Sequence, residues 1–273
     1  MYRHLCAALA AVTLSGCAGA RGPVYEYRPS EAPLRYQIND HSDLLVQTPM
    51  GDQHNRDSTI AIVVLDVGQR TADAHEVSAF FETLDIWAGG DMNQQHLEGG
   101  DMLGKAFRGT LSDQGMISVS EAPEMPSELG EATDPAAIFA DLLLPLPPSG
   151  DESAESWPHK TAMTVETAMT VNNSYDGSAR FAGDTTWNGQ AARIIVSEGT
   201  ITSSGRGYPP GAPGEIEFTM SGTATTRYFW DPQRGVMLGS VSSAKAEGDL
   251  DLPSMAMTMP ISFTGSKEVR LVR

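Results

Sequence analysis

Cysteine, basic charge and long apolar runs are scarce in this chain of 273 residues. Its two cysteines, Cys6 and Cys17, lie near the start, so the rest of the chain cannot form a disulfide or a zinc–thiolate site. Lysine and arginine number 18 against 35 aspartates and glutamates, which gives a net charge of −17. This acidic excess opposes the phosphate neutralisation on which nucleic-acid binding depends, so DNA and RNA are not expected partners.

The apolar stretch near the N-terminus, Leu5 to Leu14, is too short to span a membrane. As a helix it would rise about 15 Å, which is half the thickness of a bilayer core. Arg3 and His4 precede it, and a positive start followed by a short apolar stretch is typical of a secretory signal. We therefore expect residues 1–16 to be a signal peptide that is removed on export.

The next residues, Leu14-Ser15-Gly16-Cys17, resemble the lipobox of bacterial lipoproteins. The resemblance implies cleavage before Cys17 and attachment of lipid to its sulfur. Two or three acyl chains such as palmitate anchor a protein stably, because each buried methylene contributes about 0.8 kcal/mol. By the sorting rule of enterobacterial lipoproteins, Ala18 in place of aspartate implies the outer membrane, with the domain in the cell envelope or periplasm. The alternative is an ordinary secretory signal cleaved near Ala18–Ala20.

Two further regions follow the signal. Residues 17–33 are predicted to be a lipidated N-terminus and flexible linker, because the segment is rich in proline and charge and lacks apolar periodicity. Residues 34–273 are predicted to form a single β-rich domain. Two β halves, residues 34–122 and 159–273, flank a proline-rich helical connection from Pro123 to Pro158.

Apolar and polar residues alternate along most of the body, as in half-buried strands. The alternation is clearest from Ile216 to Trp230. Turn signals separate such rows at Asn188-Gly189, Asp113–Gly115 and Asp231–Gly235. The predicted fold is mainly β, a large curved antiparallel sheet or half-barrel with one short helix, and we expect Gly222 and Gly239 at bends.

One helix is predicted, over residues 134–144. Asp134 is a suitable N-cap, Pro135 fits the first helical position, and Pro145 ends the segment. We expect this helix against or inside the concave face of the sheet. The segment Val77 to Trp87 fits either a helix face or a strand, and the strand is favoured.

Two features of the body resemble known envelope proteins. Long curved antiparallel strands with a covering helix behind a lipobox are similar to the half-barrel lipoprotein carriers of the bacterial envelope. The string Gly104–Gly115, followed by Leu144–Pro148 and Trp157, resembles a pattern in uncharacterised bacterial envelope proteins. Neither resemblance supplies a catalytic residue.

No catalytic motif is found in the sequence. It contains no Gly-x-Ser-x-Gly elbow, and its histidines are not spaced as helical metal ligands. Alternating acids at Glu247, Asp249 and Asp251 leave a calcium site or a glycosidase pair as alternatives to plain solvent exposure. We predict no catalytic residue, no cofactor and no metal site. Five histidines are predicted to be solvated: His41, His54, His75, His96 and His159.

Methionine is the most suggestive side chain, because it forms soft and adaptable apolar surfaces. Three interpretations are open: packing in a core, a groove for a flexible hydrophobic ligand, and Cu(I) bound by thioethers. Alternation places Met255, Met257 and Met259 on one face of one predicted strand. Six methionines on predicted strands are the candidate ligand-binding residues: Met163, Met169, Met220, Met255, Met257 and Met259.

These patterns favour a membrane-anchored, non-enzymatic binding or carrier domain for a hydrophobic small molecule. The membrane contact is expected through the lipid at Cys17, because an acidic surface is repelled by anionic head groups. A structural or assembly role with another envelope protein is the second hypothesis. A hydrolase without a recognisable motif is the third.

Overall fold

The computed structural model describes residues 25–71, 74–90, 94–124, 138–139, 142–148, 155–166, 168–208 and 214–272. Strands dominate these residues, and two short 3-10 segments, η1 (Gly100–Met102) and η2 (Pro253–Met255), accompany them. The strands are β1 (Leu34–Thr48), β2 (Gly51–Thr71), β3 (Ala74–Ala88), β4 (Gln95–Glu98), β5 (Phe107–Ser112), β6 (Ile117–Glu121), β7 (Ser156–Glu166), β8 (Met169–Trp187), β9 (Gln190–Gly207), β10 (Ile216–Asp231), β11 (Val236–Leu252) and β12 (Met257–Val272).

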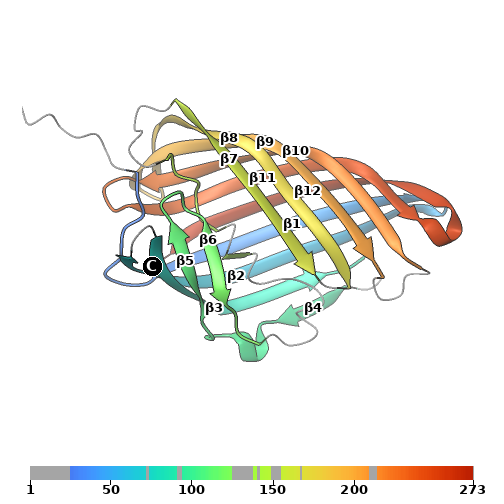
Figure 1. Cartoon of the computed structure of the whole chain (residues 1–273), viewed down its shortest axis with the longest axis horizontal. Coiled ribbons are helices and arrows are strands. Elements are labelled where there is room, and N and C mark those ends of the chain that lie inside the picture. The colour runs from blue at the N-terminus through green and yellow to red at the C-terminus, as the bar shows by residue number, and fades with distance from the viewer. Residues whose placement is uncertain are drawn as a thin grey trace, which may run out of the picture.

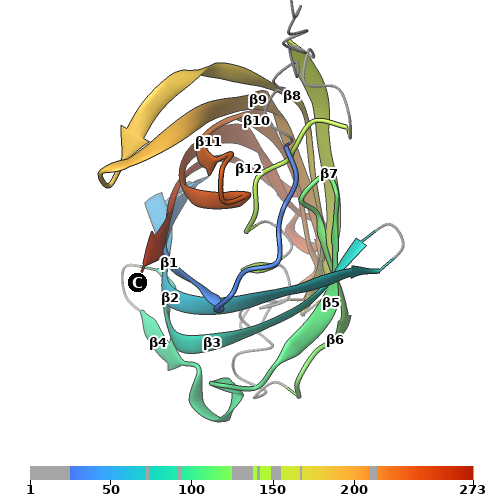
Figure 2. The same cartoon turned by 90° about the vertical axis from the view of Figure 1, so that its left-hand side faces the viewer.

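All of these strands belong to one antiparallel sheet (Figure 1). Their order is β6-β5-β3-β2-β1-β12-β11-β10-β9-β8-β7, and β4 pairs with β3 beyond the end of β5. The sheet curls strongly, as Figure 2 shows, but it stays open, with β6 and β7 as its edges. The prediction of a mainly β protein with a large curved antiparallel sheet is confirmed.

The first and last strands along the chain, β1 and β12, join the two halves of the sheet. β1 pairs with β12 in unbroken register from Arg35 opposite Val272 to Val46 opposite Ile261. Strands β1 to β6 therefore lie on one side of this pair, and β7 to β12 lie on the other. The two predicted β halves contribute adjacent parts of one sheet.

The turns between strands lie where the sequence predicts them. Asn188 and Gly189, both with positive φ, connect β8 to β9 in a two-residue hairpin. Gly115 and Gly235, also with positive φ, lie at the exits of the β5–β6 and β10–β11 turns. The segment Val77 to Trp87 is a strand, as favoured, within β3.

The two glycines predicted at bends, Gly239 and Gly222, have different surroundings. The register between β10 and β11 shifts between Phe229, which pairs with Gly239, and Trp230. Gly239 therefore lies beside a β-bulge, a feature that bends a strand, as expected. Gly222 lies in regular register instead, where an added Cβ would come within 1.9 Å of the Lys245 carbonyl oxygen. Its glycine therefore permits close approach of two strands, and the bend expected there stays a prediction.

The helix predicted over residues 134–144 needs correction. Among the described residues only Ile138 and Phe139 have helical backbone, while Leu142–Leu144 are buried in irregular structure. Residues 134–137, 140 and 141 lie outside the described residues. Three consecutive leucines point in different directions in a helix, so a helix packed on one face could not bury them all. The expected position is confirmed for Phe139, which packs on Phe81 and Phe107 against the inner face.

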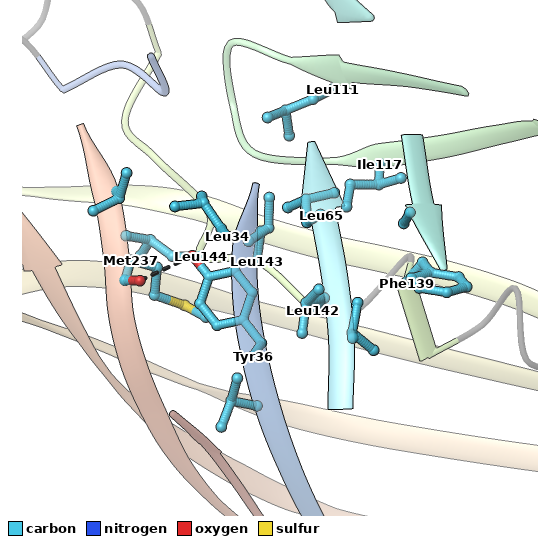
Figure 3. Packing of buried hydrophobic residues seen from close by; sticks show 14 of the residues in the cluster. Leu34, Tyr36, Leu65, Leu111, Ile117, Phe139, Leu142, Leu143, Leu144 and Met237 are labelled. Atoms are coloured by element: carbon cyan, nitrogen blue, oxygen red, sulfur yellow. Dashed lines mark hydrogen bonds between the residues drawn. The ribbon is translucent and has the colours of Figure 1, made fainter. Parts of the chain in front are cut away.

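The hydrophobic core covers one half of the inner face, which we call the packed half (Figure 3). Tyr36, Leu65 and Met237 come from the sheet, and Leu142 and Leu144 lie over them. The Tyr36 hydroxyl donates to the Met237 carbonyl at 2.9 Å, which satisfies a polar atom that would be costly to bury unpaired. Burial raises the pKa of this hydroxyl, so it stays neutral.

Part of the predicted linker belongs to this core. Tyr25 and Tyr27 are buried, and the Tyr27 ring packs edge-on against Trp230. The Tyr27 hydroxyl donates to the Leu144 carbonyl and accepts from the Leu144 N–H, both at 3.0 Å. The linker prediction is therefore wrong for Tyr25 and Tyr27. The free energy gained by burying two aromatic side chains exceeds the conformational entropy lost when this proline-rich segment is ordered.

A short segment spans the gap between the two sheet edges, and we call Leu142–Pro148 the bridging segment. The Leu146 N–H donates to the Gln114 carbonyl in the β5–β6 turn at 3.0 Å. The Trp157 indole in β7 donates to the Pro145 carbonyl at 3.2 Å. The bridging segment thus links the two edges across the inside of the curl.

The described residues contain no helix with the length and apolar character needed to cross a membrane.

Candidate functional site

The rest of the inner face, on β7 to β12, carries five of the six predicted methionines, and we call it the methionine half. Met163 lies opposite Asn173, Asn173 opposite Ser203, and Ser203 opposite Met220, so the two methionines share one row across four strands. Side chains in one such row point to the same face of a sheet. Alternation along each strand also places Met169, Met257 and Met259 on the inner face.

Met255 is the exception. It lies in η2, outside the strands, and is 53% exposed. The following residue, Ala256, has left-handed backbone, so the alternation that starts at Met257 does not extend back to Met255. The prediction that three methionines share one strand face is therefore wrong for this residue.

The methionine half is apolar but not filled. Met259 and Ile261 are buried, whereas most of its apolar side chains are half-buried, in contrast to the sealed packed half. Half-buried side chains on a concave face present apolar area that a ligand can cover. The half-buried apolar members are Met163, Val165, Met169, Val171, Ile201, Ile216, Phe218, Met220, Leu250, Met257 and Phe263.

A hollow of about 460 Å³ lies along β9, β10 and β11 at this end of the sheet. Met220 and Gly248 of the inner face contribute to its lining, together with Ser203 of the same row. The other six lining residues belong to the alternating rows of the outer face: Thr202, Ser204, Thr219, Ser221, Glu247 and Asp249. The hollow is therefore mainly polar, and it does not mark a ligand site on the methionine half.

A row of small residues separates the two halves of the inner face. Gly177, Gly199, Ala224, Ala244 and Gly265 pair successively across β8 to β12. A Cβ on Gly199 would lie 2.8 Å from Cζ of Tyr175, so the tyrosine ring lies across the glycine. The row makes room for large side chains from the neighbouring rows.

The ring of Tyr175 reaches across this row to a polar cluster. Its hydroxyl lies 2.7 Å from Oγ of Ser197, and Nδ1 of His159 lies 2.8 Å from the same oxygen. A serine beside a histidine suggests a nucleophile. Ser197 is only 1% exposed, however, so a substrate carbonyl cannot approach its oxygen. The cluster satisfies polar groups at the boundary of the packed half.

Three histidines, His54, His75 and His159, differ from the expectation of solvated side chains, and the half-buried His54 contacts Asp43. His75 is buried, with Nδ1 3.0 Å from the Gly68 carbonyl oxygen, and His159 is half-buried in the cluster just described. Cross-strand pairing, which the sequence spacing does not reveal, places both beside their partners. His41 and His96 are exposed, as predicted.

A second hollow of about 460 Å³ is lined mainly by polar side chains of β1, β2 and β12. Asp43 lies within it, 2.9 Å from Nδ1 of His54, and Arg56 approaches the same carboxylate. The hydrogen bond from His54, more than any other contact, lowers the pKa of Asp43. This hollow lacks the apolar lining of the methionine half and does not continue it.

The alternating acids lie on the outer face. Glu247 and Asp249 are exposed on β11, in rows that alternate with the inner-face rows of Ala246 and Gly248. This arrangement favours plain solvent exposure, because successive outward carboxylates on one strand do not converge on an ion.

Comparison with known proteins does not assign this chain to a family. The sequence matches no protein-family model and no curated protein. The proposed lipid attachment site, Cys17, lies outside the described residues.

Proposed function

We propose that this chain is a lipid-anchored envelope lipoprotein whose β domain binds a hydrophobic ligand without catalysing a reaction. The observation that carries the proposal is the half-buried methionine half of the inner face. Contiguous apolar side chains left half-buried on one face of a protein often mark a binding site. Thioether side chains adapt to flexible chains, so the ligand class is a molecule with one or more alkyl chains.

The packed half supports the same interpretation. Tyr27, Phe139 and Leu144 fill that part of the curl, so the chain itself shows how an apolar segment seals the inner face. The methionine half offers the same kind of surface with more flexible side chains. A ligand bound there would lie end to end with the core.

Substitution of two methionines tests this site. The double variant Met163→Gln/Met220→Gln is expected to bind a fluorescent long-chain fatty acid at least tenfold more weakly than the wild type. Placing amide groups against an alkyl chain costs about 1–3 kcal/mol, and about 1.4 kcal/mol corresponds to a factor of ten. Binding is measured by fluorescence titration, and native mass spectrometry of purified protein reports any lipid that copurifies.

The matched control is Met116→Gln. Met116 is 49% exposed in the β5–β6 turn, at the sheet edge formed by β6 and not on β7 to β12, so this variant should bind the probe as the wild type does. Equal weakening by Met116→Gln would show a nonspecific effect. If the wild-type protein neither binds the probe nor carries lipid, the carrier proposal is wrong.

The proposed anchor has a separate test. On extraction of whole cells with a phase-separating detergent, the wild type should enter the detergent phase and Cys17→Ala the aqueous phase. Loss of the thioether removes the acyl chains that hold the protein on the membrane. Unchanged partitioning of Cys17→Ala would overturn the anchor without affecting the ligand-binding proposal.

A further inference from the structure

The pairing of β3 with β4 gathers three metal-binding side chains on the outer face of the sheet. Asp85 lies directly opposite Glu98, and Trp87 lies directly opposite His96, two positions along each strand. Residues two apart on a strand share a face, so Asp85, His96 and Glu98 project from the same side. One ligand atom from each of the three lies within 4.8 Å of the others.

The imidazole of His96 is held in a defined orientation. Its ring stacks on Trp87 with centroids 4.6 Å apart and planes 9° from parallel. Its Nε2 atom lies 3.3 Å from Oδ1 of Asp85. A stack of this kind restricts rotation of the imidazole and keeps a ring nitrogen beside the carboxylates.

The two carboxylates form an unfavourable pair without a cation. Like charges directly opposite each other destabilise an antiparallel pair. Within the described part of the chain, neither Asp85 nor Glu98 forms an ion pair with lysine or arginine, and the contact of Asp85 is with His96. A bound cation would relieve the repulsion and would join β4 to β3 at the same time.

We propose that Asp85, His96 and Glu98 bind a divalent transition-metal ion, with zinc as the representative. Imidazole nitrogen with carboxylate oxygen suits zinc, whereas calcium takes oxygen ligands alone. Zinc lies about 2.0–2.2 Å from such atoms, so its ligand atoms are about 3.4 Å apart. His96 and Asp85 already have this spacing, at 3.3 Å, and Glu98 would approach by no more than about 1.4 Å. Three protein ligands leave the remaining coordination positions to water.

This site is independent of the hydrophobic ligand site. It lies on the outer face near a sheet edge, and the methionine half lies on the inner face of β7 to β12. The sequence analysis predicted no metal site. Asp85 is separated in the sequence from His96 and Glu98, so their proximity could not be recognised there.

Zinc titration of the full chain tests the proposal. Isothermal titration calorimetry with zinc chloride at neutral pH should show one saturable event of about one ion per chain in the wild type. Both His96→Ala and Glu98→Gln should weaken it at least tenfold, because each removes one of three ligands. The matched control His54→Ala removes a histidine that also lies 2.9 Å from a carboxylate and should leave the affinity unchanged.

The variants must be shown to fold before their zinc affinities are compared. Circular dichroism first confirms that the variants are folded, and Glu98→Gln, which keeps the shape of the side chain, settles the result if His96→Ala unfolds. Zinc should also raise the unfolding temperature of the wild type and not of Glu98→Gln, because the ion binds only the folded site. Absence of binding to the wild type, or equal affinity in wild type and Glu98→Gln, would overturn the site.

Discussion

Gly115→Ala is expected to lower the free energy of unfolding by about 2–5 kcal/mol. Gly115 has φ +84°, where an L-residue costs about 1–2 kcal/mol. Its new Cβ would also lie 2.1 Å from the backbone oxygen of Leu144 and 3.0 Å from the Tyr27 ring. The backbone of Leu144 cannot give way without disturbing the bridging segment, and such overpacking costs about 1–3 kcal/mol. Urea denaturation measures the loss.

Gly189→Ala is the matched control. Gly189 has nearly the same backbone, with φ +78°, but an added Cβ there meets no atom within 4 Å. This variant should lose about 1–2 kcal/mol, from the backbone alone. The difference between the two variants measures the contact of the β5–β6 turn with the bridging segment, and equal losses would show that this contact contributes nothing.

Tyr27→Phe is expected to lower the free energy of unfolding by about 2–6 kcal/mol. The hydroxyl satisfies both the N–H and the carbonyl of Leu144 in the buried core. Without it, two buried backbone groups lose their partner, and each unsatisfied group costs about 1–3 kcal/mol. Tyr208→Phe, at a tyrosine that is 67% exposed, should change the stability little. Similar urea midpoints for Tyr27→Phe and the wild type would contradict this role.

The same hydroxyl predicts alkaline sensitivity. Burial, more than any other cause, raises the pKa of Tyr27 well above its ordinary value. A group with a raised folded-state pKa stabilises the fold fully below the unfolded pKa, and this contribution is lost as pH rises towards the folded pKa. The stability of the wild type should therefore fall above about pH 10, the ordinary pKa of tyrosine, and fall less in Tyr27→Phe.

The sheet and its turns could be predicted from the sequence because their signals are local. Alternation along a strand needs only neighbouring residues, and positive φ at Asn188 and Gly189 is a property of those residues. The buried tyrosines were missed although Tyr25 and Tyr27, two positions apart, show the same alternation. Proline and charge around them suggested a linker.

The candidate sites depend on register between strands, which the sequence does not reveal. Alternation predicted the shared face of Met257 and Met259, but the row that joins Met163 to Met220 requires the pairing of four strands. The cluster of Asp85 and His96 arises because β4 returns to pair with β3 after a loop. Bulges and loop lengths set such pairings, so spacing alone could not find them.

The pairing of β1 with β12 has a consequence for biosynthesis. During translation β1 is made before the other strands of the sheet and can pair with β2 as soon as β2 leaves the ribosome. Its other neighbour, β12, is translated only after all the strands between them. Until then one side of β1 exposes unpaired backbone groups, which invite association with other chains. Completion of the sheet is therefore a late event, and shielding of β1 by a chaperone should improve the yield of native protein.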